Sequence, residues 1–320
     1  MASGDEIGLN SRSVPWERAA IEKLLLAGVK ERRAARRWRM FKSVIWIALF
    51  AVLIWAFISD RSISNTAPGP HTAVVSIRGE IADDTDASAA NILPAMRDAL
   101  ADSDTKALIL LINSPGGSPV QAGLINDEIW RLRAKYKKPI YAVVEETCAS
   151  AAYYIASAAD QIFVNKASIV GSIGVLMNGF GFVDAMNKLG IERRLYTSGE
   201  NKGFLDPFSP VTPQQREFAQ SLLDDIHGQF IDAVKKGRGN RLKITPETFS
   251  GLFWTGDQAI KLGLADQLGS EDSVARDVVG ASKLVDYTNK SSIAERFAKR
   301  LGAAIGAGAV HALGMVPTLR

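Results

Sequence analysis

VVEETCASAAYYIASAAD, residues Val143 to Asp160, joins an apolar, β-branched run to a helix made mostly of alanine and tyrosine. The junction carries three small side chains with a hydroxyl or a thiol, Thr147, Cys148 and Ser150. Small residues are common where a helix starts close to a sheet, and packing alone explains them. A nucleophile at this place would gain from the unpaired backbone N–H groups of the helix start, which stabilise an oxyanion. The stretch alone favours packing, so the choice between a packing role and a nucleophile site depends on the rest of the chain.

Runs typical of strands alternate with runs typical of helices around this junction. Two continuous apolar runs, 106–112 and 139–145, flank a segment at 118–136 whose apolar residues recur with helical spacing. This alternation predicts an α/β domain with a parallel sheet. We expect further strands at 72–81, 161–165, 168–176 and 192–197, and helices at 87–102 and 212–236. Pro94 should lie in the first turn of its helix or kink it, and Pro213 should open the long helix.

The charge of the chain is concentrated at its N-terminus. Residues 1–43 carry ten Lys/Arg and five Asp/Glu, which leaves 28 basic and 29 acidic residues for the remainder. The basic balance therefore belongs to an N-terminal arm, and we expect no nucleic-acid binding by the main domain. The single cysteine excludes an internal disulfide, and the three scattered histidines do not suggest a metal cluster.

An uncharged apolar run, VIWIALFAVLIWAFI, follows the basic arm from Val44 to Ile58. An Arg-rich cluster precedes it and Asp60 follows it, which argues against a buried helix of a soluble core. A cleaved signal peptide would have a shorter positive region. We predict an uncleaved transmembrane anchor at 44–59 and a linker at 60–71. The positive-inside rule places residues 1–43 in the cytoplasm, so the main domain is expected to face outward, which in a bacterium with two membranes means an inner-membrane anchor and a periplasmic domain.

Five segments occur together in a recognisable order: INSPGGSP, CASAAYY, VGSIGV, SGENKGFLDPF and WTGDQAIKLGLADQLG. Over residues 72–287 the chain resembles the short, single-repeat form of signal peptide peptidase A, a family of membrane-anchored serine peptidases of the Clp/crotonase superfamily. The resemblance implies a Clp/crotonase-like fold with repeated ββα units, preceded by one transmembrane helix. It implies no cofactor. Residues 288–320 remain as a C-terminal tail, which begins as an amphipathic helix by its spacing and is a candidate for self-cleavage.

The resemblance also assigns roles to five residues. Ser150 corresponds to the nucleophile and Lys202 to the general base. Ser172 corresponds to the residue that orients this lysine, and the backbone N–H groups of Gly117 and Ala151 correspond to the oxyanion hole. The family motif, usually written ASGGYY, has two glycines after the nucleophile where this chain has Ala151 and Ala152. Their methyl groups should narrow the space beside the nucleophile.

The chemistry of the residues agrees with a Ser-Lys dyad. A serine needs a base, and a lysine can serve if an apolar surrounding lowers its pKa from about 10.4. Phe204, Leu205 and Phe208 follow Lys202 and are candidates for that cover. Cys148 is a rival nucleophile, although a buried role is the commoner one for a lone cysteine.

We therefore expect a membrane-anchored serine endopeptidase that degrades remnant signal peptides. The resemblance implies a homo-oligomeric ring in which Ser150 of one subunit works with Lys202 of its neighbour. Two alternatives stay open from the residues alone. A crotonase-like acyl-thioester enzyme would use the same backbone N–H pair without Lys202, and a non-catalytic membrane scaffold would need neither residue.

Overall fold

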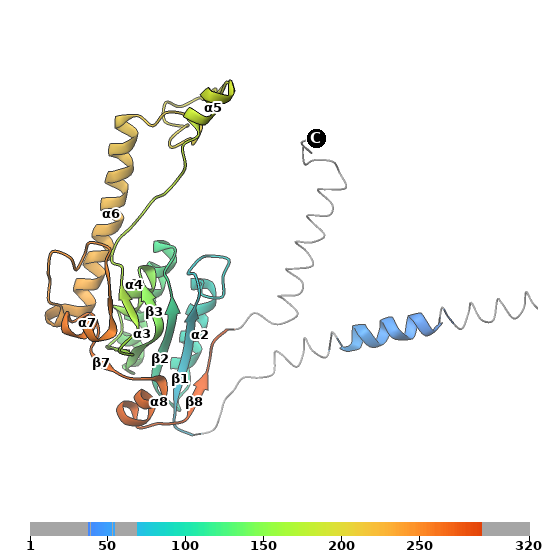
Figure 1. The fold of residues 1–320 in the computed structure, drawn as a ribbon. Coiled ribbons are helices and arrows are strands. Elements are labelled where there is room, and N and C mark those ends of the chain that lie inside the picture. Colours follow the sequence, from blue (N-terminus) through green and yellow to red (C-terminus); the bar gives the residue numbers. More distant parts are fainter. Residues whose placement is uncertain (1–37, 39, 53, 55–68, 290–320) are drawn as a thin grey trace, which may run out of the picture. The chain divides into compact units, whose positions relative to one another are not determined.

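The computed structural model of the chain describes Trp38, residues 40–52, Ile54 and residues 69–289 (Figure 1). Contacts divide the chain into two units, and residues 69–289 fall within the larger one, Asn65–Ser291. Residues 40–52 of the other unit are helical, with exposed apolar side chains such as Trp46 and Phe50. No helix among the described residues is long and apolar enough to cross a membrane. Most of the basic arm, the end of the predicted anchor, most of the linker and nearly all of the tail lie outside the described residues, so their predictions stay predictions.

The larger unit is built on an eight-stranded, largely parallel sheet. Its path is β6-β5-β3-β2-β1-β8, with β4 paired to β3 and β7. Every pairing is parallel except that between β5 and β6. The strands are β1 (His71–Arg78), β2 (Thr105–Ser114), β3 (Ile140–Ala149), β4 (Gln161–Val164), β5 (Ile169–Gly171), β6 (Phe253–Thr255), β7 (Gln267–Leu268) and β8 (Leu284–Asp286). The predicted α/β class with a parallel sheet is confirmed.

Both faces of the central strands are buried, which explains their continuous apolar sequences. In β2, Leu108, Leu110 and Ile112 point into the main core, whereas Ile109 and Leu111 belong to a smaller cluster on the opposite face. This alternation follows from the two-residue period of a strand. The main core also contains apolar side chains from five helices, which attach these helices to the sheet.

The helices of the larger unit are α2 (Ala89–Ala101), α3 (Pro119–Tyr136), α4 (Ala151–Ala156), α5 (Val183–Leu189), α6 (Pro213–Arg238), α7 (Gly256–Lys261) and α8 (Glu271–Ser273), with short turns η1 (Gly239–Arg241) and η2 (Val274–Val279). Local sequence explains where α6 begins. Thr212 and Gln215 form a capping box, and Pro213 occupies the first turn as predicted.

Two expectations about strands are wrong, and so is the first of the two alternatives for Pro94, a place in the first turn of its helix. Residues 192–197 form no strand, because they are exposed and pair with no strand in the described part of the chain. The strand expected at 168–176 is limited to β5, since the backbone turns at Ser172 with φ +54°. Pro94 lies inside α2, beyond its first turn.

A buried ion pair fixes the end of α6 to the sheet. Arg238 is 1% exposed, and its guanidinium donates two hydrogen bonds of 2.8 Å to the Asp266 carboxylate. Its Nε donates a third to the carbonyl of Gly263, and Asp266 also accepts from the N–H of Ile162 in β4. The α6 helix passes so close to α4 that a Cβ on Gly237 would lie 1.8 Å from the Ser157 carbonyl oxygen. These contacts place α6 beside the helix that follows Ser150.

Candidate active site

Ser150 is the single residue between β3 and α4. Its backbone has φ +53° and ψ −124°, a conformation that residues with a side chain seldom adopt. The N–H of Ser150 donates to the carbonyl of Gly171 in β5 at 2.8 Å, which holds the turn against the sheet. The hydroxyl does not cap α4. A sharp strand-to-helix turn of this kind presents its side chain at the end of the sheet, where a substrate can reach it.

The glycine-rich loop after β2 lies directly against this turn. A Cβ on Gly116 would lie 2.7 Å from the Cβ of Ser150, so only glycine fits there. Two backbone hydrogen bonds with Ile81 hold the other side of the loop. The Ile81 N–H donates to the Gly116 carbonyl at 2.9 Å, and the Ser118 N–H donates to the Ile81 carbonyl at 2.7 Å. In this parallel bridge, the N–H of Gly117 itself points away from Ile81.

Two backbone N–H groups beside Ser150 are available to a ligand. Gly117 turns its N–H away from Ile81, and Ala151 is the first residue of α4, whose N–H has no helical acceptor. Neither group donates to an acceptor within the residues that the structure describes. Two such donors next to a serine hydroxyl are the components of an oxyanion hole.

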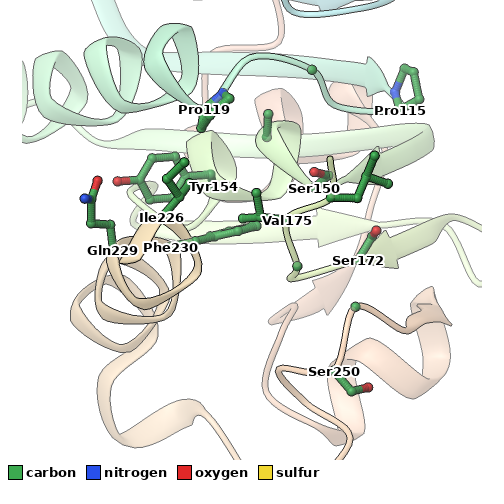
Figure 2. A pocket seen from close by; sticks show the side chains of 15 residues that line it. Pro115, Pro119, Ser150, Tyr154, Ser172, Val175, Ile226, Gln229, Phe230 and Ser250 are labelled. Carbon is green, nitrogen blue, oxygen red and sulfur yellow. The ribbon is translucent and has the colours of Figure 1, made fainter. Parts of the chain in front are cut away.

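A cavity of about 550 Å³ brings these groups together (Figure 2). Four of the five predicted site residues line it: Gly117, Ser150, Ala151 and Ser172. Four chain segments and the α6 helix contribute the remaining wall: Pro115, Pro119, Tyr154, Gly174, Val175, Leu176, Ile226, Gln229, Phe230, Ser250 and Gly251. The cavity is therefore assembled from segments that lie far apart in the sequence.

Ser172 lies at the same end of the cavity as Ser150 (Figure 2). Its N–H donates to the Leu252 carbonyl at 2.7 Å, which holds the backbone after β5 in its left-handed turn. Its hydroxyl has no hydrogen-bond partner among the described residues. The side chain is thus free to bind a group that enters the cavity from outside the chain.

Lys202 is not among the residues that line the cavity. It belongs to residues 176–212, named here the extension, which runs from the cavity wall through α5 to the start of α6. Figure 1 shows α5 beside the outer end of α6, away from the strands. Lys202 is exposed, and its neighbour Phe204 packs on Phe218 of α6 with ring centroids 5.4 Å apart. Within one chain, the structure does not bring Lys202 to Ser150, and it leaves the side chain without the expected apolar cover.

The two described histidines are engaged elsewhere. His71 is fully buried and bonded to Thr105 and Tyr287 at the start of β1. The Nε2 of His227 lies 3.1 Å from the Ile173 carbonyl oxygen, which can only accept, so that nitrogen carries the proton. Neither residue lines the cavity. His311 lies outside the described residues.

Cys148 is a buried residue of β3, and its thiol should be inert. Its side chain is 0% exposed, and burial raises the pKa of the thiol. Because the thiolate is the reactive form, we expect iodoacetamide to modify Cys148 only after unfolding in urea, as measured by mass spectrometry. Cys148→Ala should leave the reactivity of Ser150 largely unchanged. Rapid modification of the native protein would contradict this burial.

Sequence reasoning missed the far end of the cavity. Tyr154 and Phe230 meet there edge to face, with ring centroids 5.0 Å apart, and Ile226 lies beside them (Figure 2). Tyr154 follows Ala151 by one helical turn, a spacing that was available in the sequence. The α6 residues lie more than seventy positions away from Ser150, and no local pattern connects them to it.

A half-buried serine in a strained turn, two free backbone N–H groups and a cavity with apolar walls are the components of a serine hydrolase that works by acyl transfer. The sequence comparisons define the class further. Residues 133–284 match the model of peptidase family S49, a range that contains Ser150, Ser172 and Lys202. The chain belongs to peptidase family S49.

Relatives of different lengths share this domain. Two proteins named Na(+)/H(+) antiporter NhaA, from Brucella melitensis and Brucella abortus, are 46% identical over 194 residues, 61% of this chain but 26% of their own length. A putative protease of Synechocystis is 31% identical over 220 residues, 69% of this chain and 75% of its own. A putative signal peptide peptidase SppA of Enterococcus faecium is 28% identical over 239 residues, 72% of this chain and 69% of its own.

Proposed function

We propose that this chain is a membrane-anchored serine endopeptidase with a Clp/crotonase-like fold that degrades remnant signal peptides by a Ser150–Lys202 dyad. The observation that carries the proposal is the position of Ser150, in a strained turn with the free N–H groups of Gly117 and Ala151 on the same cavity. The name of the Enterococcus relative supports the substrate class.

The proposed reaction is acyl transfer to Ser150. The Ser150 Oγ attacks the carbonyl carbon of a peptide bond while the Nζ of Lys202 takes the hydroxyl proton. The carbonyl oxygen becomes an oxyanion that accepts hydrogen bonds from Gly117 and Ala151. Lys202 then gives the proton to the leaving amine, and an acyl-Ser150 ester remains. A water molecule, deprotonated by Lys202, hydrolyses this ester and returns the Ser150 hydroxyl.

We infer that Lys202 reaches this cavity from a neighbouring subunit of a ring. Three observations support the inference: Lys202 lies away from its own cavity, the Ser172 hydroxyl is free, and the extension exposes large apolar side chains. An exposed apolar patch of this kind needs a protein surface to cover it. The largest exposed fractions on the extension are those of Leu176 (79%), Phe180 (82%), Leu189 (74%) and Tyr196 (90%).

Mixed oligomers test the shared site. Ser150→Ala and Lys202→Ala subunits should each be inactive alone and recover part of the activity when they are unfolded together and reassembled. The recovery arises because some interfaces then join an intact Ser150 to an intact Lys202. Peptide hydrolysis, with subunit exchange verified by native mass spectrometry, is the measurement. Mixed oligomers without any recovery would place both residues of a site in one chain.

The membrane location rests on the N-terminal part of the chain. The described helical residues 40–52 expose apolar side chains such as Ile47, as a lipid-facing helix does. With the Arg-rich arm in the cytoplasm, the peptidase domain of the bacterial inner-membrane protein would face the periplasm. Protease digestion of spheroplasts should then degrade the domain and spare residues 1–43.

A fluorophosphonate probe tests the activity itself. The full chain in detergent should form a covalent adduct at Ser150 and should cleave an apolar, signal-peptide-like peptide. A crotonase-like enzyme or a scaffold would give no cleavage, and labelling at another serine would overturn the assignment. The matched control is Ser250→Ala, which removes another hydroxyl of the cavity wall and should still be labelled at Ser150.

A further inference from the structure

We propose that Ala151 selects the residue on the acyl side of the cleaved bond, because its methyl group excludes side chains that are branched at Cβ. The inference rests on the proposed function, since it takes the Ala151 N–H as an oxyanion donor. It names a substrate class for the site: residues with an apolar side chain and an unbranched Cβ.

Covalent geometry puts the Ala151 methyl next to that residue. The substrate carbonyl oxygen lies about 2.7–3.1 Å from each oxyanion donor nitrogen during the reaction. The Cβ of Ala151 is two bonds from its own nitrogen, which is a separation of about 2.5 Å. The methyl therefore lies within contact distance of the residue whose carbonyl is attacked. A second branch at the Cβ of that residue brings an additional carbon into this space.

Only one of the two alanines after the nucleophile can act in this way. Both alanines belong to the main core, with Ala151 4% exposed and Ala152 0% exposed, and of the two it is Ala151 that also lines the cavity. Ala151 and Tyr154 are three residues apart, so they lie on the same face of α4. Ala151 therefore shares the cavity wall with Tyr154, whose ring lies at the end of the cavity away from Ser150 (Figure 2).

The far end of the cavity suits a long, flexible apolar side chain. Tyr154 and Phe230 meet edge to face at 5.0 Å, and Ile226 adds an aliphatic surface. Leucine, methionine and phenylalanine can pass the Ala151 methyl with their single Cβ substituent and reach this end. Valine, isoleucine and threonine carry a branch at the point where the methyl lies.

Two isomeric peptides isolate the effect of branching. They differ only on the acyl side of the cleaved bond, where one has norvaline and the other valine, which have equal side-chain volume. The wild-type chain should cleave the norvaline peptide with a kcat/KM about tenfold higher or more, the discrimination typical of one misplaced carbon. Ala151→Gly should bring the two values within about twofold, and Ala151→Ser should widen the difference.

The matched control is Ala152→Gly, which makes the same change one residue later and should leave the kcat/KM ratio unchanged. Each ratio comes from one preparation, so a loss of folded protein cancels. Unchanged ratios in Ala151→Gly and Ala151→Ser, with both peptides cleaved, would overturn the inference. Cleavage of neither peptide by the wild-type chain would instead overturn the proposed function, and this inference with it.

Discussion

Ser150→Ala should reduce peptide hydrolysis by about 10⁴-fold or more, the scale seen when the nucleophile of a serine protease is removed. The loss is this large because Ser150 is the residue whose strained turn places a hydroxyl beside the free N–H groups of Gly117 and Ala151. Cys148 is buried in the core, and the described histidines do not line the cavity. Initial rates on an apolar peptide, with active sites counted by a fluorophosphonate probe, give the measurement.

Substitution of the proposed base, Lys202, should reduce peptide hydrolysis as strongly as substitution of the nucleophile. Lys202→Ala removes the proton acceptor, and Lys202→Arg keeps the positive charge on a group that does not deprotonate at working pH. Both should be inactive, while His227→Ala should keep most of the activity. Substantial hydrolysis by Lys202→Ala would remove this residue from the mechanism and would leave Ser150 without a proposed base.

Asp266→Ala should destabilise the protein by about 3–5 kcal/mol, the largest effect on folding that we expect. The variant leaves the guanidinium of Arg238 buried without its carboxylate, and a buried charge without a partner is strongly unfavourable. Urea unfolding followed by circular dichroism measures the free energy of unfolding. The matched control is Asp277→Ala, which breaks the exposed pair with Arg276 and should change stability by less than about 1 kcal/mol.

The same pair predicts how stability depends on pH. Burial alone would raise the pKa of the Asp266 carboxyl, but the hydrogen bonds and charge of Arg238 hold it below its ordinary value of 3.8. A carboxyl with a lowered pKa in the folded state stabilises the protein above its unfolded pKa. That contribution is complete above about pH 4 and is lost as the pH falls through the lower, folded value. A double variant, Arg238→Met with Asp266→Leu, should lose this part of the acid sensitivity.

Sequence patterns predicted the elements whose signals are local. The continuous apolar runs of β2 and β3 were recognised because strands of a parallel sheet are buried on both faces. The start of α6 was predicted from Thr212 and Pro213, which act within one turn. The strand expected at 192–197 did not form because these residues have no neighbouring strand among the described residues, and strand pairing is a non-local property.

The site residues show the same difference between local and non-local signals. The residues that meet in the cavity, Gly117, Ser150, Ala151 and Ser172, come from the ends of β2, β3 and β5, and the family motifs mark each of them. Phe230 and Ile226 come from a distant helix that carries no motif. The partner of Lys202 could not be derived either, because residue order does not tell whether two loops meet within one chain or between two.

The backbone at Ser150 implies that this molecule is less stable with its nucleophile than it would be without it. A side chain at φ +53° and ψ −124° costs on the order of 1–3 kcal/mol, and glycine adopts the same conformation without that penalty. Ser150→Gly should therefore unfold at a higher temperature than Ser150→Ala, although both are inactive. Selection for thermal stability alone would favour glycine at this position. The serine is therefore explained by selection for catalysis.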